Sequence, residues 1–183
     1  MEKKNDLLKH FWNVTYAHSI AYFIAGVLAM TFMNYDAIWA TEIMSGFYRP
    51  IDSPIVVLGG SLLQIPRGIL IAFFILPLRK VFFEEKSGLL KLGLIVFGFS
   101  VISTIGAVCS SYEGFIYLKL PLEIHFMGYF ECILYISLFI GILFAAQKFA
   151  HKIILIVLPI VLMVLIVLMG ITGYLAAIGV LQV

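Results

Sequence analysis

Charged residues are scarce in this sequence. Asp, Glu, Lys and Arg make up 12% of the 183 residues, whereas hydrophobic residues make up 63%, and the mean hydropathy is +1.11. Because soluble domains carry about 25% charged residues, this composition excludes an ordinary soluble domain. The net charge of +2 is too small to indicate a nucleic-acid-binding protein. We therefore expect an integral membrane protein whose main partner is the lipid bilayer.

Cysteine and recognisable catalytic motifs are scarce as well. The two cysteines, Cys109 and Cys132, lie in or beside apolar stretches and have no CxxC spacing, so we interpret them as small apolar residues. The sequence contains no nucleophile elbow, no HExxH motif and no paired-Asp motif. We therefore expect no metal ion and no cofactor. The lack of catalytic motifs also favours a protein that is not an enzyme.

Long apolar stretches dominate what is present. A bilayer core about 30 Å thick requires roughly 20 apolar residues in a helix, and five stretches are long enough. We predict an all-α integral membrane protein, in which a single domain over residues 1–183 forms a bundle of about five transmembrane helices. The five predicted spans are residues 12–33, 54–77, 89–109, 124–146 and 153–180.

Lys and Arg residues predict how the chain is oriented. Short connections that carry these residues are retained on the cytoplasmic side. With the N-terminus inside, only Arg49 and Lys119 lie outside, and Arg67 lies within a span. This asymmetry predicts a multi-pass protein of the cell membrane with a cytoplasmic N-terminus and an external C-terminus. The inner residues are Lys3, Lys4, Lys9, Arg79, Lys80, Lys86, Lys91, Lys148 and Lys152.

The first outer connection, residues 34–54, has a helical pattern of apolar residues. The apolar residues spaced along one face of a helix are Ile38, Trp39, Ile43, Met44 and Phe47. This pattern predicts a short helix that lies in the membrane interface. An unstructured loop is the alternative.

Small residues on the first span predict a close helix neighbour. Ala17, Ala21, Ala25 and Ala29 recur at every fourth position. In lipid, such a stripe allows two helix backbones to approach closely and gain dispersion contacts. The neighbour is either an internal segment, such as residues 170–179, or another protein. In the second case the stripe would join a membrane protein partner or a second copy of the chain.

The second span contains an arginine close to its middle. Arg67 there costs about 2.5 to 3.5 kcal/mol on insertion scales, so we expect it to have polar company. Gln64, three residues earlier, shares its helix face. Pro66 cannot donate a backbone hydrogen bond, and we predict that it kinks the helix.

The fourth span supplies the acidic partner that we expect for this arginine. Glu131 is the only carboxylate well inside a span, and we predict an Arg67–Glu131 pair with Gln64 and Tyr135 as hydrogen-bonding neighbours. The alternative is a pair that only fixes helix register. The candidate ligand-binding residues are Arg67, Gln64, Glu131 and Tyr135, with His125 and Glu123 nearer the outer mouth.

Another histidine, His18, is expected one turn into the first span from the cytoplasmic side. His125 is expected near the opposite face, which argues against a haem held by these two residues.

Three functions fit these observations. The first is a component that binds or transports a small polar or anionic solute through an outward-facing pocket, since midplane charges and broken helices are typical of transport proteins. The second is a non-catalytic membrane subunit or assembly factor of a larger complex. The third is an intramembrane lipid-modifying enzyme that uses Glu123, His125 or Glu131 as an acid or base.

Overall fold

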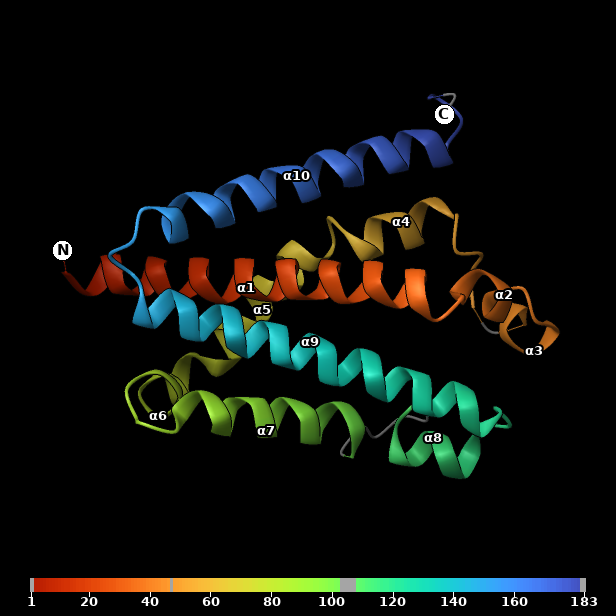
Figure 1. The fold of residues 1–183 in the computed structure, drawn as a ribbon, viewed down its shortest axis with the longest axis horizontal. Coiled ribbons are helices and arrows are strands. Elements are labelled where there is room, and N and C mark those ends of the chain that lie inside the picture. The colour runs from red at the N-terminus through yellow and green to blue at the C-terminus, as the bar shows by residue number, and fades with distance from the viewer. Residues whose placement is uncertain (1, 47, 103–107, 182–183) are drawn as a thin grey trace.

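Helices form the secondary structure of the computed structural model, which describes residues 2–46, 48–102 and 108–181. No strand occurs within these ranges, so the predicted all-α class is confirmed for them. Three long helices run the length of the molecule (Figure 1): α1 (Glu2–Phe32), α9 (Leu122–Lys148) and α10 (Ile154–Ala177).

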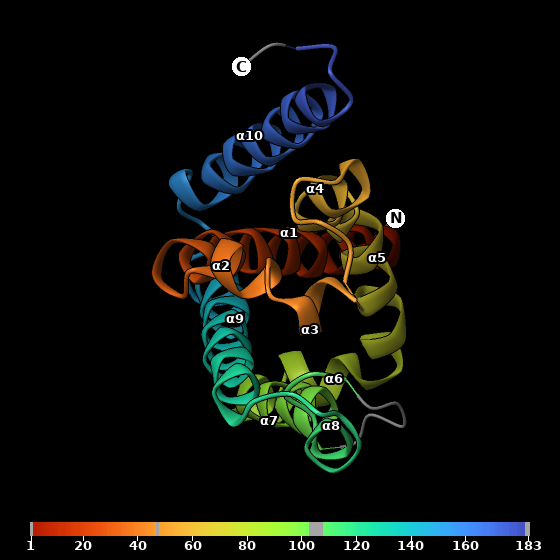
Figure 2. The same cartoon turned by 90° about the vertical axis from the view of Figure 1, so that its right-hand side faces the viewer.

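Helix α1 lies at the centre of the structure. It packs along α5 (Gln64–Ile75) and α9, and less extensively against α10. Figure 2 shows α10 and α4 (Pro54–Gly60) on one side of α1, and α7 (Gly88–Val101) on the other side. Helices α7 and α8 (Tyr112–Tyr117) pack on α9, and α4 packs mainly on α10, so these elements surround the central helix in a second layer.

The alanine stripe explains why α1 is central. Its four alanines are at most 2% exposed, because the chain's own helices cover them. Gly68 of α5 packs so closely on α1 that an added Cβ would lie 2.9 Å from the Cα of Thr15. The stripe is thus used for internal packing, and it leaves no exposed alanine surface for a partner protein.

The second predicted span is broken. Helix α4 ends at Gly60 and α5 begins at Gln64, and the axis turns by 46° between Pro54–Gly60 and the following segment Gln64–Phe83. The bend therefore precedes Pro66, where the sequence predicted a kink. Pro66 lies in the first turn of α5, where an amide N–H has no partner within the helix and its absence costs little.

Fewer helices than predicted are long enough to cross a bilayer. Among the described residues, three pass on length and apolar composition, namely Asn5–Phe32, α9 and α10, and the bent pair makes a fourth if it is one span. Helix α7 has 14 residues, or about 21 Å. Residues 103–107 of the predicted third span lie outside the described ranges. The structure supports a membrane protein and does not confirm five spans.

The connection after α1 forms two short helices, α2 (Tyr35–Trp39) and α3 (Glu42–Ser45), where one interfacial helix was predicted. Asn34 ends α1 with a φ of 50°, a left-handed conformation that Asn tolerates better than most residues. Helix α8 lies at the same end of the molecule (Figure 1). This end is opposite to the start of α1.

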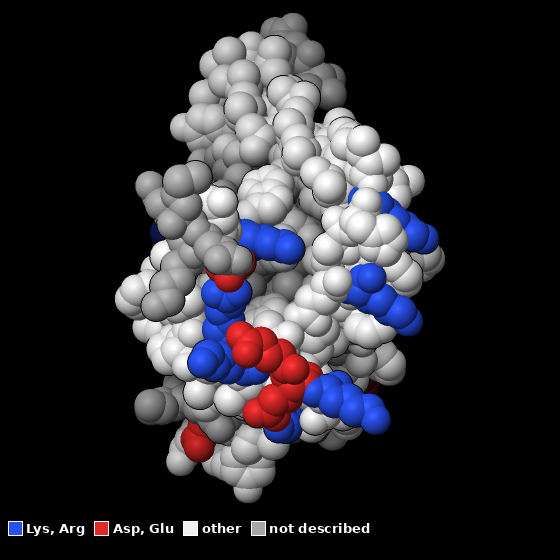
Figure 3. Space-filling model, turned by 90° about the vertical axis from the view of Figure 1, so that its left-hand side faces the viewer, with Lys and Arg blue, Asp and Glu red and all other residues white. Residues whose placement is uncertain are grey.

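Charged side chains gather at the other end of the molecule, as Figure 3 shows. The start of α1 lies there beside η1 (Leu76–Leu78) and α6 (Arg79–Phe83). Arg79 Nη2 lies 3.9 Å from Asp6 Oδ2, and Lys91 pairs with Glu85. Apolar side chains are exposed along most of α10 between the two ends. This distribution suits a protein whose middle is surrounded by lipid.

Candidate ligand-binding site

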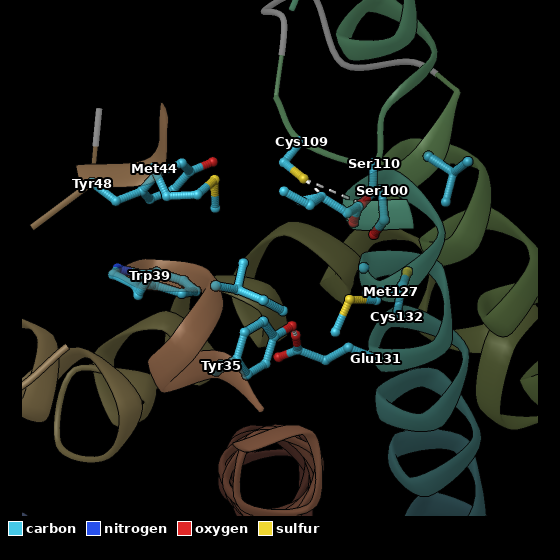
Figure 4. A pocket seen from close by; sticks show the side chains of 14 residues that line it. Tyr35, Trp39, Met44, Tyr48, Ser100, Cys109, Ser110, Met127, Glu131 and Cys132 are labelled. Atoms are coloured by element: carbon cyan, nitrogen blue, oxygen red, sulfur yellow. Dashed lines mark hydrogen bonds between the residues drawn. The ribbon is translucent and has the colours of Figure 1, made fainter. Parts of the chain in front are cut away.

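A pocket with a cavity volume of about 310 Å³ lies at the end of the molecule that carries α2, α3 and α8. Figure 4 shows Trp39 and Tyr48 on one side of it and α9 on the other. A cavity of this volume matches small-molecule sites in other proteins. The lining residues come from α2, α3, α7, α9 and their connections: Tyr35, Ile38, Trp39, Met44, Tyr48, Ser100, Val101, Cys109, Ser110, Ile124, Met127, Gly128, Glu131 and Cys132.

A hydrogen bond between Tyr35 and Glu131 forms the polar part of this pocket. Glu131 lies about 14 Å along α9 from the helix start, and its carboxylate accepts a 2.5 Å bond from the hydroxyl of Tyr35. Burial, followed by this hydrogen bond, raises the pKa of Tyr35 well above its ordinary value of 10. Tyr35 therefore remains a protonated donor.

Aromatic rings build the wall that faces Glu131. Asn34 adopts a left-handed conformation, and Tyr35 follows it at the start of α2, which contacts α1. The ring of Trp39 packs edge-to-face with Tyr35 at 5.4 Å and with Tyr48 at 5.3 Å between ring centroids. Trp39 Nε1 donates a 2.9 Å hydrogen bond to the carbonyl of Arg49. These contacts fix the orientation of the indole ring.

Sulfur-containing side chains complete the lining. Met44 is buried, at 3% exposure, and Met127 projects from α9. Both cysteines of the chain also face this pocket (Figure 4), and both are free thiols. The sequence predicted Cys109 and Cys132 to be small apolar residues, and their place in a pocket was not anticipated. Together these side chains form a polarisable, mostly apolar wall.

A second polar cluster lies deeper, around His18 of α1. His18 is fully buried, and its Nε2 lies 3.1 Å from Gln64 Oε1 while its Nδ1 lies 2.7 Å from the hydroxyl of Tyr135. Because an amide oxygen only accepts, Nε2 is the donor, and Nδ1 of the neutral ring accepts from Tyr135. His18 and Tyr135 lie near the middle of Asn5–Phe32 and of α9 respectively. The cluster is thus close to the midpoints of both helices.

Gln64 also bridges the break in the second span. Its side-chain Nε2 donates to the carbonyl of Gly59 at 2.5 Å, and its backbone carbonyl accepts a 3.3 Å hydrogen bond from Ser19 Oγ. Through its side chain and its backbone, one buried residue therefore ties the end of α4 and the start of α5 to α1.

Arg67 does not pair with Glu131, contrary to the sequence-based prediction. Its Nη1 makes a long, 3.4 Å hydrogen bond to Gln64 Oε1, and its guanidinium lies 5.5 Å from the ring centroid of Tyr22. Within the described part of the chain, no ion pair joins Arg67 to a carboxylate. The predicted pair does not form because Glu131 is bonded to Tyr35 and Arg67 lies on the exposed face of α5.

The six predicted site residues are divided among separate places. Gln64, Arg67 and Tyr135 gather around His18, whereas Glu131 lines the pocket. His125 is buried, accepts a 3.1 Å hydrogen bond from the backbone N–H of Ser110 and stacks on Phe115. Glu123 is exposed in the first turn of α9. Neither of the last two lines the pocket.

Besides the other residues that line the pocket, the sequence analysis missed three residues that contact the predicted polar side chains, namely His18, Tyr22 and Tyr35. We placed the first span at residues 12–33, which put His18 near the cytoplasmic end, but α1 begins at Glu2 and His18 is central in it. Tyr35 follows an Asn at a predicted helix end. An Asn in that position is a signal for a left-handed turn that returns the chain, and this signal could have pointed to Tyr35.

Comparison with known proteins provides no further guide to the site. No family model matches the chain, and neither a curated protein nor a solved structure matches it.

Proposed function

We propose that the protein is a membrane component that binds a small solute, in the pocket where Tyr35 meets Glu131. The observation that carries this proposal is a carboxylate within the Leu122–Lys148 membrane-spanning helix, facing a cavity of about 310 Å³. An ionisable side chain within a span is costly, and such residues face cavities and mark substrate sites. The apolar and aromatic lining suits a solute that has both a polar and an apolar part.

The distribution of basic residues supports a pocket that opens to the outside. Lys9, Arg79, Lys80 and Lys148 lie on elements at the end opposite to the pocket, where Lys91 also pairs with Glu85. If this basic end is cytoplasmic, as the positive-inside rule predicts, the pocket faces outward. The proposed arrangement has the N-terminus inside, the C-terminus outside and five passes, with α7 as the short third pass.

The bent second segment supports a role in transport. In transport proteins, discontinuous helices near the bilayer midplane often form substrate sites, and the surrounding helices move around such breaks. Here the break at residues 61–63 lies beside the His18 cluster. A solute that enters the pocket could continue toward this break if α4 and α5 shift relative to α1.

Thermal unfolding of the intact protein in mild detergent tests solute binding. We expect at least one class among cationic, zwitterionic, neutral and anionic small solutes to raise the melting temperature. Met127→Trp, which fills the pocket, should abolish that rise, whereas Ile133→Trp on the exposed side of α9 should retain it. Stabilisation that persists in Met127→Trp, or no stabilisation by any class, would contradict the proposal.

Arg67 gives specific support to the alternative function, a subunit of a membrane complex. Its guanidinium contacts Gln64 and the Tyr22 ring, but the residue as a whole is exposed on α5 near Leu70. An arginine that meets lipid there is costly. A partner helix that carries a carboxylate would relieve this cost. A stoichiometric protein that co-purifies with the wild-type chain and is lost from Arg67→Gln would favour this alternative over solute binding.

A further inference from the structure

We infer that the solute bound at the Tyr35–Glu131 pocket is an organic cation, with an ammonium group that meets the Glu131 carboxylate and an apolar body that contacts the aromatic wall. This inference rests on the proposed solute-binding function and specifies its substrate class. It reverses the sign of the charge expected from the sequence, where Arg67 indicated a polar or anionic solute.

The charge of the pocket carries the first step of the argument. Glu131 is the only charged side chain among the described residues that line the cavity. Its carboxylate receives one hydrogen bond, from the neutral hydroxyl of Tyr35, and no cation of the described chain lies within ion-pair distance. A partly buried carboxylate without a counter-charge is unfavourable. A bound cation would supply that counter-charge, whereas an anion would be repelled.

The aromatic wall carries the second step. Tyr35, Trp39 and Tyr48 line the cavity, and Figure 4 shows Trp39 and Tyr48 across it from α9. The negative faces of such rings attract ammonium groups, and Trp is the strongest of them. The indole of Trp39 is held by its hydrogen bond to the Arg49 carbonyl, so little ordering is required when a cation binds. Carboxylate and aromatic rings together therefore favour a cation.

The size and softness of the cavity indicate an organic cation. A cavity of about 310 Å³ is larger than a desolvated metal ion occupies, and it falls at the lower end of the range for small organic ligands. Met44 and Met127 add flexible thioether contacts for an apolar body. We therefore expect a small amine or quaternary ammonium compound.

Three molecules of matched shape test this inference on the full-length protein in detergent. Choline carries a trimethylammonium group. The neutral alcohol (CH3)3C–CH2–CH2–OH carries a tert-butyl group in its place. The carboxylate tert-butylacetate, (CH3)3C–CH2–COO−, is an anion with the same tert-butyl group. We expect choline to bind at least about tenfold more tightly than the neutral alcohol, and tert-butylacetate to bind least. Benzyltrimethylammonium serves as a larger second cation.

Two variants assign the charge preference to Glu131. Glu131→Gln keeps the side-chain length and removes the charge, so the preference for choline over the neutral alcohol should shrink to the smaller part that the aromatic rings supply. Glu42→Gln removes an exposed carboxylate from α3 and should retain the preference for choline. Isothermal titration gives the dissociation constants, and thermal unfolding confirms that both variants are folded.

The outcomes separate this inference from the proposed function. If choline and the neutral alcohol bind equally to the wild type, and neither binds to Met127→Trp, the preference for a cation is wrong. The pocket and the proposed function are then retained. If neither choline nor benzyltrimethylammonium binds, the inference of an organic cation is also wrong, whether or not other solutes bind. Cation binding that is unchanged in Met127→Trp contradicts the pocket itself, and with it the proposed function.

Discussion

Two polar side chains within the candidate membrane-spanning helices differ in how many of their hydrogen-bonding groups have a partner. His18 uses both ring nitrogens, one with Gln64 and the other with Tyr135. Glu131 is a charged group that has only Tyr35. A buried group with all its hydrogen bonds stabilises a unique packing. We therefore assign His18 to stability, whereas under the proposed function the bound solute supplies the second partner of Glu131.

Replacing Tyr135 by Phe tests the assignment of His18. The substitution removes the hydroxyl that bonds to His18 Nδ1 and leaves a buried nitrogen without a partner. We expect the free energy of unfolding to fall by about 1–3 kcal/mol, measured by denaturant or thermal unfolding in detergent. Tyr117→Phe is the control, because Tyr117 is 69% exposed on α8. Equal stability of the two variants would show that the His18 bond contributes nothing.

At this scale the sequence identified the polar residues and the contact between Gln64 and Arg67, but not the partner of Glu131. Gln64, Arg67 and Glu131 stand out because they interrupt apolar runs. Their partners depend on how far each helix is rotated and displaced along its axis, and tertiary packing decides this. The expected Arg67–Glu131 pair was wrong for this reason. Tyr35 supplies the bond to Glu131 from a turn that the apolar pattern does not reveal.

At the scale of elements, close packing of α5 and α9 on α1 positions the His18 cluster. The alanine stripe predicted a close neighbour for α1, but the internal candidate was residues 170–179, whereas α5 and α9 pack on α1 more extensively than α10 does. The sequence also indicated the apolar stretches that became α1, α9 and α10. The site of the bend was not predictable from Pro66 alone. Gly59 and Gly60 end α4 before the proline is reached, and a proline in a first helical turn does not have to bend the chain.

Gly68→Ala tests the close approach of α1 and α5. An added methyl group would meet the backbone of Thr15 at 2.9 Å, so the two helices must move apart. We expect a loss of about 1–3 kcal/mol in the free energy of unfolding, measured as for Tyr135→Phe. Gly26→Ala in α1 is the matched control, because nothing lies within 4 Å of its added methyl group. A Gly68→Ala protein as stable as Gly26→Ala would contradict the close contact.

At the scale of the whole molecule, hydropathy and basic residues predict a topology that single introduced cysteines can test. In a protein whose two natural cysteines are replaced by Ser, we place Cys at Thr41, Glu85 or Lys119. A membrane-impermeant maleimide should label the cysteines at 41 and 119 in intact cells, and the cysteine at 85 only after permeabilisation. This result follows if α7 crosses the membrane and the basic end is cytoplasmic.

Other labelling patterns would correct the topology in defined ways. If the cysteine at 119 behaves like the one at 85, α7 does not cross and the number of spans is smaller than five. If the cysteine at 85 is labelled in intact cells and the one at 41 is not, the orientation is inverted. The sequence predicts a side of the membrane for each connection. Because α7 has only 14 residues, the experiment has to decide whether it crosses the membrane.

The shortness of α7 has a consequence for the lipid around the protein. If α7 crosses the membrane as proposed, its length of about 21 Å beside α9, which at 27 residues is about 40 Å long, would place two helices of different length in one annulus of lipid. Acyl chains next to α7 would have to compress, and such mismatch costs fractions of a kcal/mol per Å. The headgroup layer would then sink locally toward the end of α7, where Ser100 and Val101 border the pocket. Thinner membranes would accommodate this protein with less deformation, so bilayer thickness itself would favour some membranes over others.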